Sequence, residues 1–512
     1  MKGASAMQLV TPLEMMKLEE QANKLGCTYE MMMDNAGNGL ADHISETAGK
    51  MQVTSLLFLC GNGNNAGDCF VAANRLAGQF SITIGLIAGI PKTRTAYTKY
   101  RMMQNVTVLT EQAKIEQAVR SATLIIDGVF GIGFRGELTP FVQSMFQIID
   151  NDPEKYCIAV DIPSGGSGLN GSAAAGTPHC IATITFGAAK HGLFLSPLAD
   201  HCGTIHFVDI GIPESAFAEL GYPAYRIDEA DVRKLLPMRP LQGHKGMFGR
   251  LLCVTGSRNM PGAAILSVKA ALRSGVGTIC VASDINVCRM LVGSTPECMM
   301  LPLPTDQDGK LSQLAGAPIL EYAKSCSAVL IGCGLGQSDT LKHLIPTLIS
   351  QIEAPIILDA DGLNALASGI DILQKAKVPV ILTPHPAEMA RLLYTSVEDV
   401  QKDRMSAAKR LASRFPKTIV VLKGTGTIVA TAERAYINTT GNSGMSKGGS
   451  GDVLAGMIAS LTAQGIAPEN AAQIGVYLHG IAGERAAEKY SRRAMLPTDL
   501  IGTLPSVFAE YE

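Results

Sequence analysis

A loop rich in glycine and asparagine follows an apolar run in the first half of this 512-residue chain. The run Ser55–Cys60 leads into Gly-Asn-Gly-Asn-Asn-Ala-Gly-Asp at 61–68, and a helical pattern follows over Cys69–Leu76. Glycines let a backbone approach a ligand closely, and a helix N-terminus offers free N–H groups to an anion. The loop departs from the dinucleotide fingerprint G-x-G-x-x-G because Asn and Asp crowd the turn. A plain tight turn is the alternative, but three polar side chains favour a binding site.

Two further apolar runs in the same half end in an acid. Asp127 begins the stretch DGVFGIGFRG, and Asp161 begins DIPSG. Ligands of an open parallel sheet lie beyond the carboxyl ends of its strands, so these acids and the Asn loop are expected to converge. The alternative is that each Asp only caps the turn that follows it. Three polar strand ends in one sheet favour a site.

The second half contains a candidate phosphate cradle backed by an acid. NTTGN at 438–442 and GGSGD at 448–452 precede a helical pattern over Val453–Gln464. Consecutive small residues that open a helix present backbone N–H groups to an anion. Asp452, beside that cradle, is placed to take a proton from a hydroxyl during phosphoryl transfer. The alternative is an ordinary first-turn acid that the helix dipole favours.

Four other strand ends of the second half carry polar or glycine-rich motifs. They are GCGLG at 332–336, DADGLN at 359–364, TPHPAE at 383–388 and KGTGT at 423–427. His385 lies between two prolines in a stiff turn, where a histidine is as often structural as functional. Lys423 could bind phosphate as a point charge or could simply be solvated, and its glycine-rich context favours a nucleotide contact.

The strands that carry these motifs are short apolar runs that alternate with helical patterns. In the first half they are Ser55–Cys60, Ile82–Ala88, Thr123–Asp127, Cys157–Asp161 and Ile181–Phe186. In the second half they are Arg250–Thr255, Gly277–Ala282, Ala328–Ile331, Pro355–Asp359, Val378–Thr383 and Thr418–Leu422. Such strands predict an α/β fold with parallel sheets covered on both faces. Their number exceeds what one sheet commonly holds, which predicts two sheets.

The length also predicts more than one domain. The best boundary lies between Tyr225 and Lys245, where a charged, proline-containing segment precedes a new strand. We therefore expect one domain over 1–222 and another over 227–512. The two halves carry different motifs, which indicates a fusion of unlike domains.

Composition excludes several classes of partner. The formal net charge is -2 and aromatic residues make up 5%, so no basic surface or set of stacking rings indicates nucleic-acid binding. The apolar stretch after Asp452 is interrupted by polar residues, so no membrane span is expected. The twelve cysteines form no CxxC pair, and several lie in apolar runs, which favours a reduced, packing role in the cytoplasm.

The motifs of the first half resemble the NAD(P)H-hydrate epimerase family over residues 9 to 215. The resemblance rests on GNGNNAGD, DGVFGIGFRG and DIPSG, with MDNAG upstream and TFGAAKHGL and DIGIP downstream. It implies a Rossmann-like, doubly wound domain that interconverts the R and S hydrates at C6 of the nicotinamide ring. Asn65, Asp127 and Ser164 match the family's potassium ligands. The positions that match its substrate contacts are Asn64, Asn65, Ala66, Gly67, Asp68, Gly131, Ile132, Gly133, Phe134, Arg135, Gly136, Glu137 and Asp161.

Within this implied site we assign proton transfer to Asp161, since a carboxylate can add or remove a proton as water leaves and returns. Lys190, in the stretch TFGAAKHGL, either fixes a loop or contacts substrate.

The motifs of the second half resemble the nucleotide-dependent NAD(P)H-hydrate dehydratases over residues 230 to 510. HKG at 244–246, PGAA at 261–264 and HGIAGE at 479–484 extend the match. It implies a ribokinase-like α/β domain that phosphorylates the hydrate hydroxyl, loses phosphate and regenerates NAD(P)H, with Mg²⁺ and ADP or ATP. The implied hydrate contacts are Ala263, Gly334, His385 and Asp452, with Asp452 as base. The implied nucleotide contacts are Lys423, Gly424, Thr425, Gly426, Thr427 and Gly451.

This sequence departs from the dehydratase pattern at Cys333, where the family often has proline, so that loop is expected to be less rigid.

The two resemblances together predict a bifunctional enzyme that repairs hydrated NADH and NADPH and that forms homo-oligomers. ADP is the expected donor, with ATP as the alternative. One rival hypothesis is a ribokinase-like kinase for a small vitamin precursor, with a non-catalytic binding or scaffold domain at its N-terminus. The HPAE turn at 385–388 argues against the kinase. The presence of Asn65, Asp127, Asp161 and Ser164 argues against the scaffold.

Overall fold

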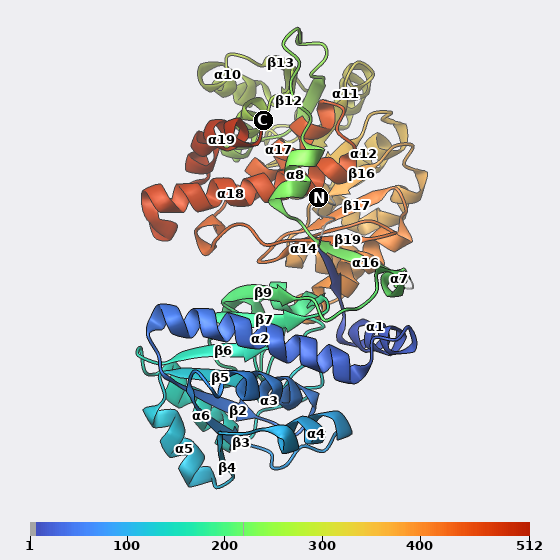
Figure 1. Ribbon diagram of the computed structural model, residues 1–512. Coiled ribbons are helices and arrows are strands. Elements are labelled where there is room, and N and C mark those ends of the chain that lie inside the picture. Colours follow the sequence, from blue (N-terminus) through green and yellow to red (C-terminus); the bar gives the residue numbers. More distant parts are fainter. Residues whose placement is uncertain (1–6, 219) are drawn as a thin grey trace. The chain divides into compact units, whose positions relative to one another are not determined.

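The computed structural model of the protein describes residues 7–218 and 220–512, which form two compact units (Figure 1). One unit comprises Gln8–Pro223, and the other comprises Ala224–Glu512 together with Met7. The division falls just before the segment in which the sequence places the boundary, because strand β10 (Ala224–Arg226) already pairs with β19 (Ala435–Asn438) of the C-terminal unit.

The N-terminal unit is built on a sheet of parallel strands with helices on both faces (Figure 1). Its spatial order is β4 (Thr107–Leu109), β3 (Ser81–Leu86), β2 (Ser55–Cys60), β5 (Leu124–Gly128), β6 (Tyr156–Val160), β7 (Ala182–Phe186) and β9 (Thr204–Val208). The chain adds strands outward from β2 on one side and then from β5 on the other, so the strand order reverses between β2 and β5. A crevice for ligands forms beyond the carboxyl ends of the strands at a reversal of this kind.

Alternate residues of these buried strands face two different helix layers, as parallel strands require. Phe58 and Ile126 pack with residues of α2 and α3, whereas Leu57 and Ile125 pack with residues of α5 and α6. A short strand β1 (Gln8–Val10) pairs in parallel with β8 (Ala189–Lys190). The helices are α1 (Pro12–Lys24), α2 (Tyr29–Met51), α3 (Asn64–Leu76), α4 (Arg94–Met102), α5 (Gln112–Ser121), α6 (Pro140–Asp150) and α7 (Glu214–Phe217), with 3₁₀ helices η1 (His191–Phe194) and η2 (Leu198–His201).

The C-terminal unit holds a second, larger array of strands, so the predicted pair of sheets is confirmed. Its spatial order is β13 (Met299–Pro302), β12 (Thr278–Ser283), β11 (Arg250–Val254), β14 (Ala328–Ile331), β15 (Ile356–Leu358), β16 (Val380–Leu382), β17 (Thr418–Leu422), β18 (Thr427–Ala430), β19 and β10. Strands β13 to β17 are parallel, whereas β18 is antiparallel to both of its neighbours. The order reverses between β11 and β14, which again creates a crevice at the carboxyl ends.

Helix α17 (Ser450–Ala463) is buried along nearly its whole length between α9 (Pro261–Arg273) and α18 (Pro468–Ala494). Gly456 permits this packing, since a Cβ there would lie 2.0 Å from the carbonyl oxygen of Ser267 on α9. The close packing fixes the first turn of α17, which carries Asp452. The other helices are α8 (Glu229–Leu235), α10 (Ile285–Ser294), α11 (Gly316–Ala323), α12 (Asp339–Gln351), α13 (Asp361–Leu366), α14 (Pro386–Leu393), α15 (Val397–Lys402), α16 (Arg404–Arg414) and α19 (Pro497–Tyr511), with 3₁₀ helices η3 (Gln313–Ala315), η4 (Ala367–Lys375) and η5 (Ser443–Met445).

Candidate active sites

A cavity of about 550 Å³ opens beyond the carboxyl ends of β2, β5 and β6 in the N-terminal unit. Its lining joins the three polar strand ends that the sequence singled out. The lining residues from these segments are Asn62, Gly63, Asn64, Asn65, Asp68, Val129, Phe130, Gly131, Ile132, Gly133, Phe134 and Asp161. Helices α1 and α2 complete the wall with Met16, Glu19, Tyr29, Met32, Met33 and Ala36.

Asp127 and Ser164 form a buried cluster, which Asn65 of the cavity lining joins through the carbonyl of Phe130. The Ser164 hydroxyl donates to Asp127 Oδ1 at 2.6 Å, and the Ser164 N–H donates to Asp127 Oδ2 at 2.7 Å. The Asn65 amide donates to the carbonyls of Phe130 and Val160 at 3.2 and 3.1 Å. Burial raises the pKa of Asp127 to about 6, and no cationic side chain of the described residues pairs with it. The cluster is therefore an oxygen-rich, buried site with an uncompensated carboxylate.

Asp161 and Lys190 form a buried ion pair inside the cavity. Lys190 Nζ lies 2.6 Å from Asp161 Oδ1, and it also donates to Thr185 Oγ1 at 3.2 Å and to the Phe186 carbonyl at 3.0 Å. These three contacts use all the donors of the ammonium group. Asp161 has a left-handed backbone, with φ of 67°, which is unusual for a residue other than glycine. Both side chains line the cavity, so Lys190 is part of the site wall.

Two further carboxyl groups face the same cavity, Asp68 from the first turns of α3 and Glu19 from α1. Burial and the nearby charge of Asp161 raise the pKa of Asp68 well above its usual range. Burial also raises the pKa of Glu19, while the charge of Lys190 opposes that rise. The cavity thus contains one ion-paired carboxylate and two carboxyl groups with raised pKa values.

Several of the predicted substrate contacts do not line the cavity. They are Ala66, Gly67, Arg135, Gly136 and Glu137. Helix α3 begins at Asn64 rather than after Asp68, so residues 66 and 67 turn into the core. Arg135 lies in an exposed turn, where its guanidinium donates to the carbonyls of Ile132 and Phe134. Their contribution to substrate binding stays a prediction.

In the C-terminal unit, Asp359 and Lys423 form a buried ion pair at the carboxyl ends of β15 and β17. Lys423 Nζ lies 2.7 Å from Asp359 Oδ1, and the Thr383 hydroxyl donates to the same oxygen at 2.6 Å. Gly451 approaches this pair closely, since a Cβ there would lie 3.2 Å from Lys423 Nζ. The structure therefore brings Lys423, Gly451 and the strand-end acid to one point.

Asp452 lies beside this pair in the first turn of α17. Burial and the nearby charge of Asp359 raise the pKa of Asp452 to about 7, while a hydrogen bond from Cys333 opposes the rise. Cys333 Sγ also donates to Asp359 Oδ2 at 3.7 Å. Ligand atoms of Cys333, Asp359 and Asp452 lie within 4.8 Å of one another. Asp452 is therefore a carboxyl group that can exchange a proton near neutral pH.

His385 caps helix α14 rather than standing free in its turn. Its Nδ1 accepts from the N–H groups of Ala387 and Glu388 at 3.1 and 3.4 Å, and its Nε2 lies 3.3 Å from Glu388 Oε1. Burial and the charge of Lys423 lower the pKa of His385. Burial raises the pKa of Glu388 to about 7. The ring is thus partly structural, although nearly half of its side chain is exposed.

Two glycine-rich segments of the C-terminal site are shaped by close contacts. Gly334 has φ of +65°, and a Cβ there would lie 2.6 Å from the Cβ of Ala263, so these two predicted contacts are neighbours. The loop 423–427 is fixed by the buried Arg404, whose guanidinium donates to the carbonyls of Leu422, Lys423 and Thr425. The loop is therefore held from behind, with Lys423 turned toward Asp359.

Sequence reasoning missed several residues of these two sites. Glu19 and Arg404 lie in ordinary helical patterns that gave no signal. Asp359 and Glu388 belong to motifs that were recognised, but neither had an assigned role. A signal for Asp359 was present, since it ends an apolar strand as Asp127 and Asp161 do.

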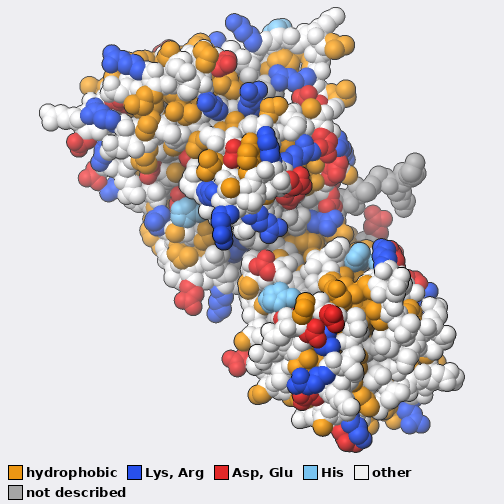
Figure 2. Space-filling view, turned by 90° about the vertical axis from the view of Figure 1, so that its left-hand side faces the viewer, with side chains coloured by type: hydrophobic (Ala, Val, Ile, Leu, Met, Phe, Trp, Pro, Cys, Tyr) orange, Lys and Arg blue, Asp and Glu red, His pale blue; other side chains and the backbone are white. Residues whose placement is uncertain are grey.

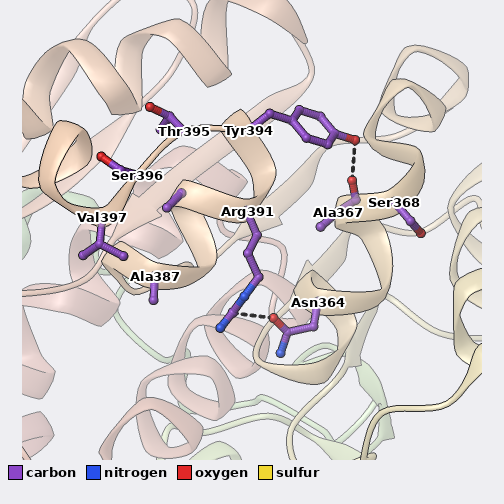
Figure 3. Close-up of a pocket in the computed structure, with 10 residues that line it drawn as sticks. Asn364, Ala367, Ser368, Ala387, Arg391, Tyr394, Thr395, Ser396 and Val397 are labelled. Carbon is purple, nitrogen blue, oxygen red and sulfur yellow. Dashed lines mark hydrogen bonds between the residues drawn. The ribbon is translucent and has the colours of Figure 1, made fainter.

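A separate hollow of about 680 Å³ lies on the C-terminal unit between α13, η4, α14 and the start of α15 (Figure 3). Arg391 points across it and donates to Asn364 Oδ1 at 2.8 Å, and the Tyr394 hydroxyl donates to the Ala367 carbonyl at 2.6 Å (Figure 3). None of the predicted site residues lines it. Its polar groups therefore hold neighbouring helices together.

The distribution of exposed charged side chains is consistent with the low net charge of the chain. Basic and acidic groups are interspersed on the face shown in Figure 2. Within the described residues, no helix combines the length and apolar character needed to cross a bilayer. All twelve cysteines are free, and most are buried.

Comparison with known proteins gives matches for both units. A family model described as NAD(P)H-hydrate dehydratase matches residues 251–506, and a model described as YjeF-related protein N-terminus matches residues 29–192. A bifunctional NAD(P)H-hydrate repair enzyme from Moorella thermoacetica is 35% identical, covering 99% of this chain and 97% of its own length. The Escherichia coli enzyme of the same name is 33% identical, covering 95% and 91%.

A solved structure extends the match to the fold of the C-terminal unit. A ribokinase-like superfamily protein from Enterococcus faecalis aligns with a TM-score of 0.50 and 27% identity, covering 56% of this chain and 96% of that chain. The predicted ribokinase-like fold of the second half is confirmed.

Proposed function

This chain belongs to the family of bifunctional NAD(P)H-hydrate repair enzymes, and we propose that its two sites divide the repair between them as follows. The N-terminal half is the epimerase, which interconverts the R and S hydrates of NADH and NADPH. The C-terminal half is the dehydratase, which returns the S hydrate to NAD(P)H. The observation that carries the division is that each unit has its own set of buried acids beside a lysine, within its own crevice.

For the dehydratase we assign the base to Asp452. Its raised pKa suits a group that accepts the proton of the hydrate hydroxyl as phosphate is transferred to that oxygen. The loop 423–427 and Gly451 would bind the nucleotide phosphates, and Ala263, Gly334 and His385 would bind the hydrate. Elimination of phosphate then leaves the restored nicotinamide ring. ADP is the proposed donor, with ATP as the alternative.

Mg²⁺ would enter the dehydratase site with the nucleotide. Mg²⁺ needs only one or two carboxylates because substrate phosphates and water complete its octahedron. Asp359 meets this requirement, whereas the Cys333 thiol is a poor ligand for so hard a cation. When bound, the ion would neutralise phosphate charge.

K⁺ is the proposed ion of the epimerase site, held by Asn65, Asp127 and Ser164. Support comes from the oxygen-rich donor set and from the buried Asp127 carboxylate that lacks a cationic partner. A bound monovalent cation stabilises the folded state by mass action, by about 2.7 kcal/mol at a hundredfold excess over its dissociation constant. K⁺ should therefore raise the melting temperature of the protein more than Na⁺ does, and Asp127→Asn should remove the difference. Equal shifts with both ions would argue against the assignment.

We also propose a cytoplasmic location and a homo-oligomeric state. The free, mostly buried cysteines support a reducing compartment. The homo-oligomeric state is what the family resemblance implies.

A direct assay tests the proposed function. Purified protein is given mixed R and S hydrates with ADP, ATP or neither, and the absorbance of the reduced nicotinamide is followed. Full recovery with a nucleotide is expected, because the epimerase converts the R form that the dehydratase cannot use. Absence of recovery with either nucleotide would overturn the proposal.

A further inference from the structure

We propose that Glu19 is a second acid–base residue of the epimerase site, which exchanges a proton with the oxygen on C6 of the hydrate. This inference rests on the proposed epimerase function. It concerns a residue of α1, a helix that carries none of the motifs by which the site was recognised.

The position of Glu19 on α1 turns its carboxyl group toward the cavity. Met16 and Glu19 both line the cavity, as expected of helix residues three positions apart. The buried residues Met15, Leu18 and Ala22 hold the same side of the helix against the core. The adjacent Glu20 points to solvent, where it pairs with Lys24 at 2.7 Å.

The lysine of the cavity does not neutralise Glu19. Lys190 Nζ uses its three donors on Asp161, Thr185 and the Phe186 carbonyl. No ion pair to Glu19 or Asp68 is formed within residues 7–218. The cavity therefore has three carboxyl groups and one committed ammonium, so a proton on Glu19 relieves the repulsion among the carboxyl groups.

Charged and titratable groups face Glu19 from the other elements that line the cavity. Asp68 approaches from α3, Asp161 from the end of β6, Lys190 from β8 and Tyr29 from α2. Burial raises the pKa of Glu19, and burial raises the pKa of Asp68 well above its usual range, so both carboxyl groups hold a proton more tightly than an exposed acid does.

Epimerisation by loss and return of water needs such a proton. The C6–O bond breaks with its electron pair on oxygen, which takes the proton from Glu19 and leaves as water, while the lone pair of the ring nitrogen forms a C=N bond. Water then adds to the opposite face of C6 and returns one proton to the carboxylates. No electrons are gained or lost overall, and the acid is regenerated. The Asp161 carboxylate, paired with Lys190 in the same cavity, stabilises the positive ring.

The test compares Glu19→Gln with Glu20→Gln in the full-length protein. Glu19→Gln should lower kcat for R/S interconversion by about 100-fold or more, the usual contribution of a general acid, with little change in KM. Glu20→Gln should leave the rate unchanged. Dehydration of pure S hydrate by the other unit should be unaffected in both variants, which reports on folding.

A pH profile separates a proton donor from a structural residue. The rate should fall as pH rises through the titration of Glu19. In Glu19→Gln the residual activity should lose this alkaline limb, because the amide does not titrate. Glu19→Asp, which keeps the carboxyl group, should recover part of the rate. An unchanged kcat, or a lower kcat with an unmoved limb, would overturn the inference. If the wild type itself shows no interconversion, the proposed function fails instead.

Discussion

The two sites of this protein use a buried lysine in opposite ways. In the N-terminal unit Lys190 pairs with Asp161, the acid that sequence reasoning chose for proton transfer. In the C-terminal unit Lys423 pairs with Asp359, so that Asp452, the acid chosen as base, is left without a cation. The same elements, a lysine and several acids at the carboxyl ends of parallel strands, therefore produce two different electrostatic results.

The difference fits the chemistry of the two reactions. Phosphorylation of a hydroxyl requires one proton to be removed, and a lone carboxyl group with a pKa of about 7 can accept it. Epimerisation develops positive charge on the nicotinamide ring and requires a proton to be given and then taken back. The ion-paired Asp161 carboxylate suits the first need, and the neighbouring carboxyl groups with raised pKa values suit the second.

The largest effect is expected for Asp452→Asn, which tests the C-terminal half of this comparison. Dehydration of the S hydrate should fall by about 100-fold to 10,000-fold, since an amide cannot accept the proton. R/S interconversion should continue at the wild-type rate, as measured by separating the two hydrates without nucleotide. Loss of both activities would contradict two independent sites.

Asp161→Asn should produce the reverse pattern. Interconversion should fall by about 100-fold, because the amide neither carries the charge nor exchanges the proton. The variant also leaves Lys190 buried without an anion, so the melting temperature should decrease. The matched control is Asp42→Asn on the same unit, which removes an anion from an exposed ion pair with Arg75. Interconversion at the normal rate in Asp161→Asn would show that the assigned acid is wrong.

These assignments show how far the sequence alone reaches. The strand-end motifs were recognisable because parallel strands are short apolar runs and their carboxyl ends meet at one edge. Asp127, Asp161 and Asp452 could be chosen in this way. Whether each acid is paired could not be predicted, since Lys190 and Lys423 reach their partners from other strands, 29 and 64 residues away.

Glu19 is a second feature of the site that the sequence does not predict. Its helix has the capping box and periodicity of any amphipathic surface helix, and the apolar positions Met15, Leu18 and Ala22 place Glu19 closer to the buried side than Glu20. The pattern does not predict that this side of α1 borders a cavity, because the other walls come from distant segments. The start of α3 also determines which residues reach the cavity. Because the helix begins at Asn64, Ala66 and Gly67 face the core.

A smaller effect is expected from pH on the rate of dehydration, which tests whether the ionisation of Asp452 controls this reaction. The rate of dehydration should fall as pH drops through about 7, because a raised pKa keeps Asp452 protonated below that value. One unit below the pKa, about a tenth of the base remains ionised, so the rate should be about tenfold lower. The measurement is kcat/KM for the S hydrate over a range of pH at saturating nucleotide. A flat profile across this range would show that another group accepts the proton.

The smallest effect is expected for Cys333→Ala, which asks what sets the proton affinity of Asp452. The thiol hydrogen bond opposes the rise that burial and Asp359 cause, so its removal should raise the pKa of Asp452 further. A hydrogen bond of this kind contributes about 1 kcal/mol, which corresponds to a shift of less than about one pH unit in the dehydration profile. Cys333→Ser keeps a donor and should move the profile less. A shift to lower pH in Cys333→Ala would show that the thiol does not stabilise the Asp452 carboxylate.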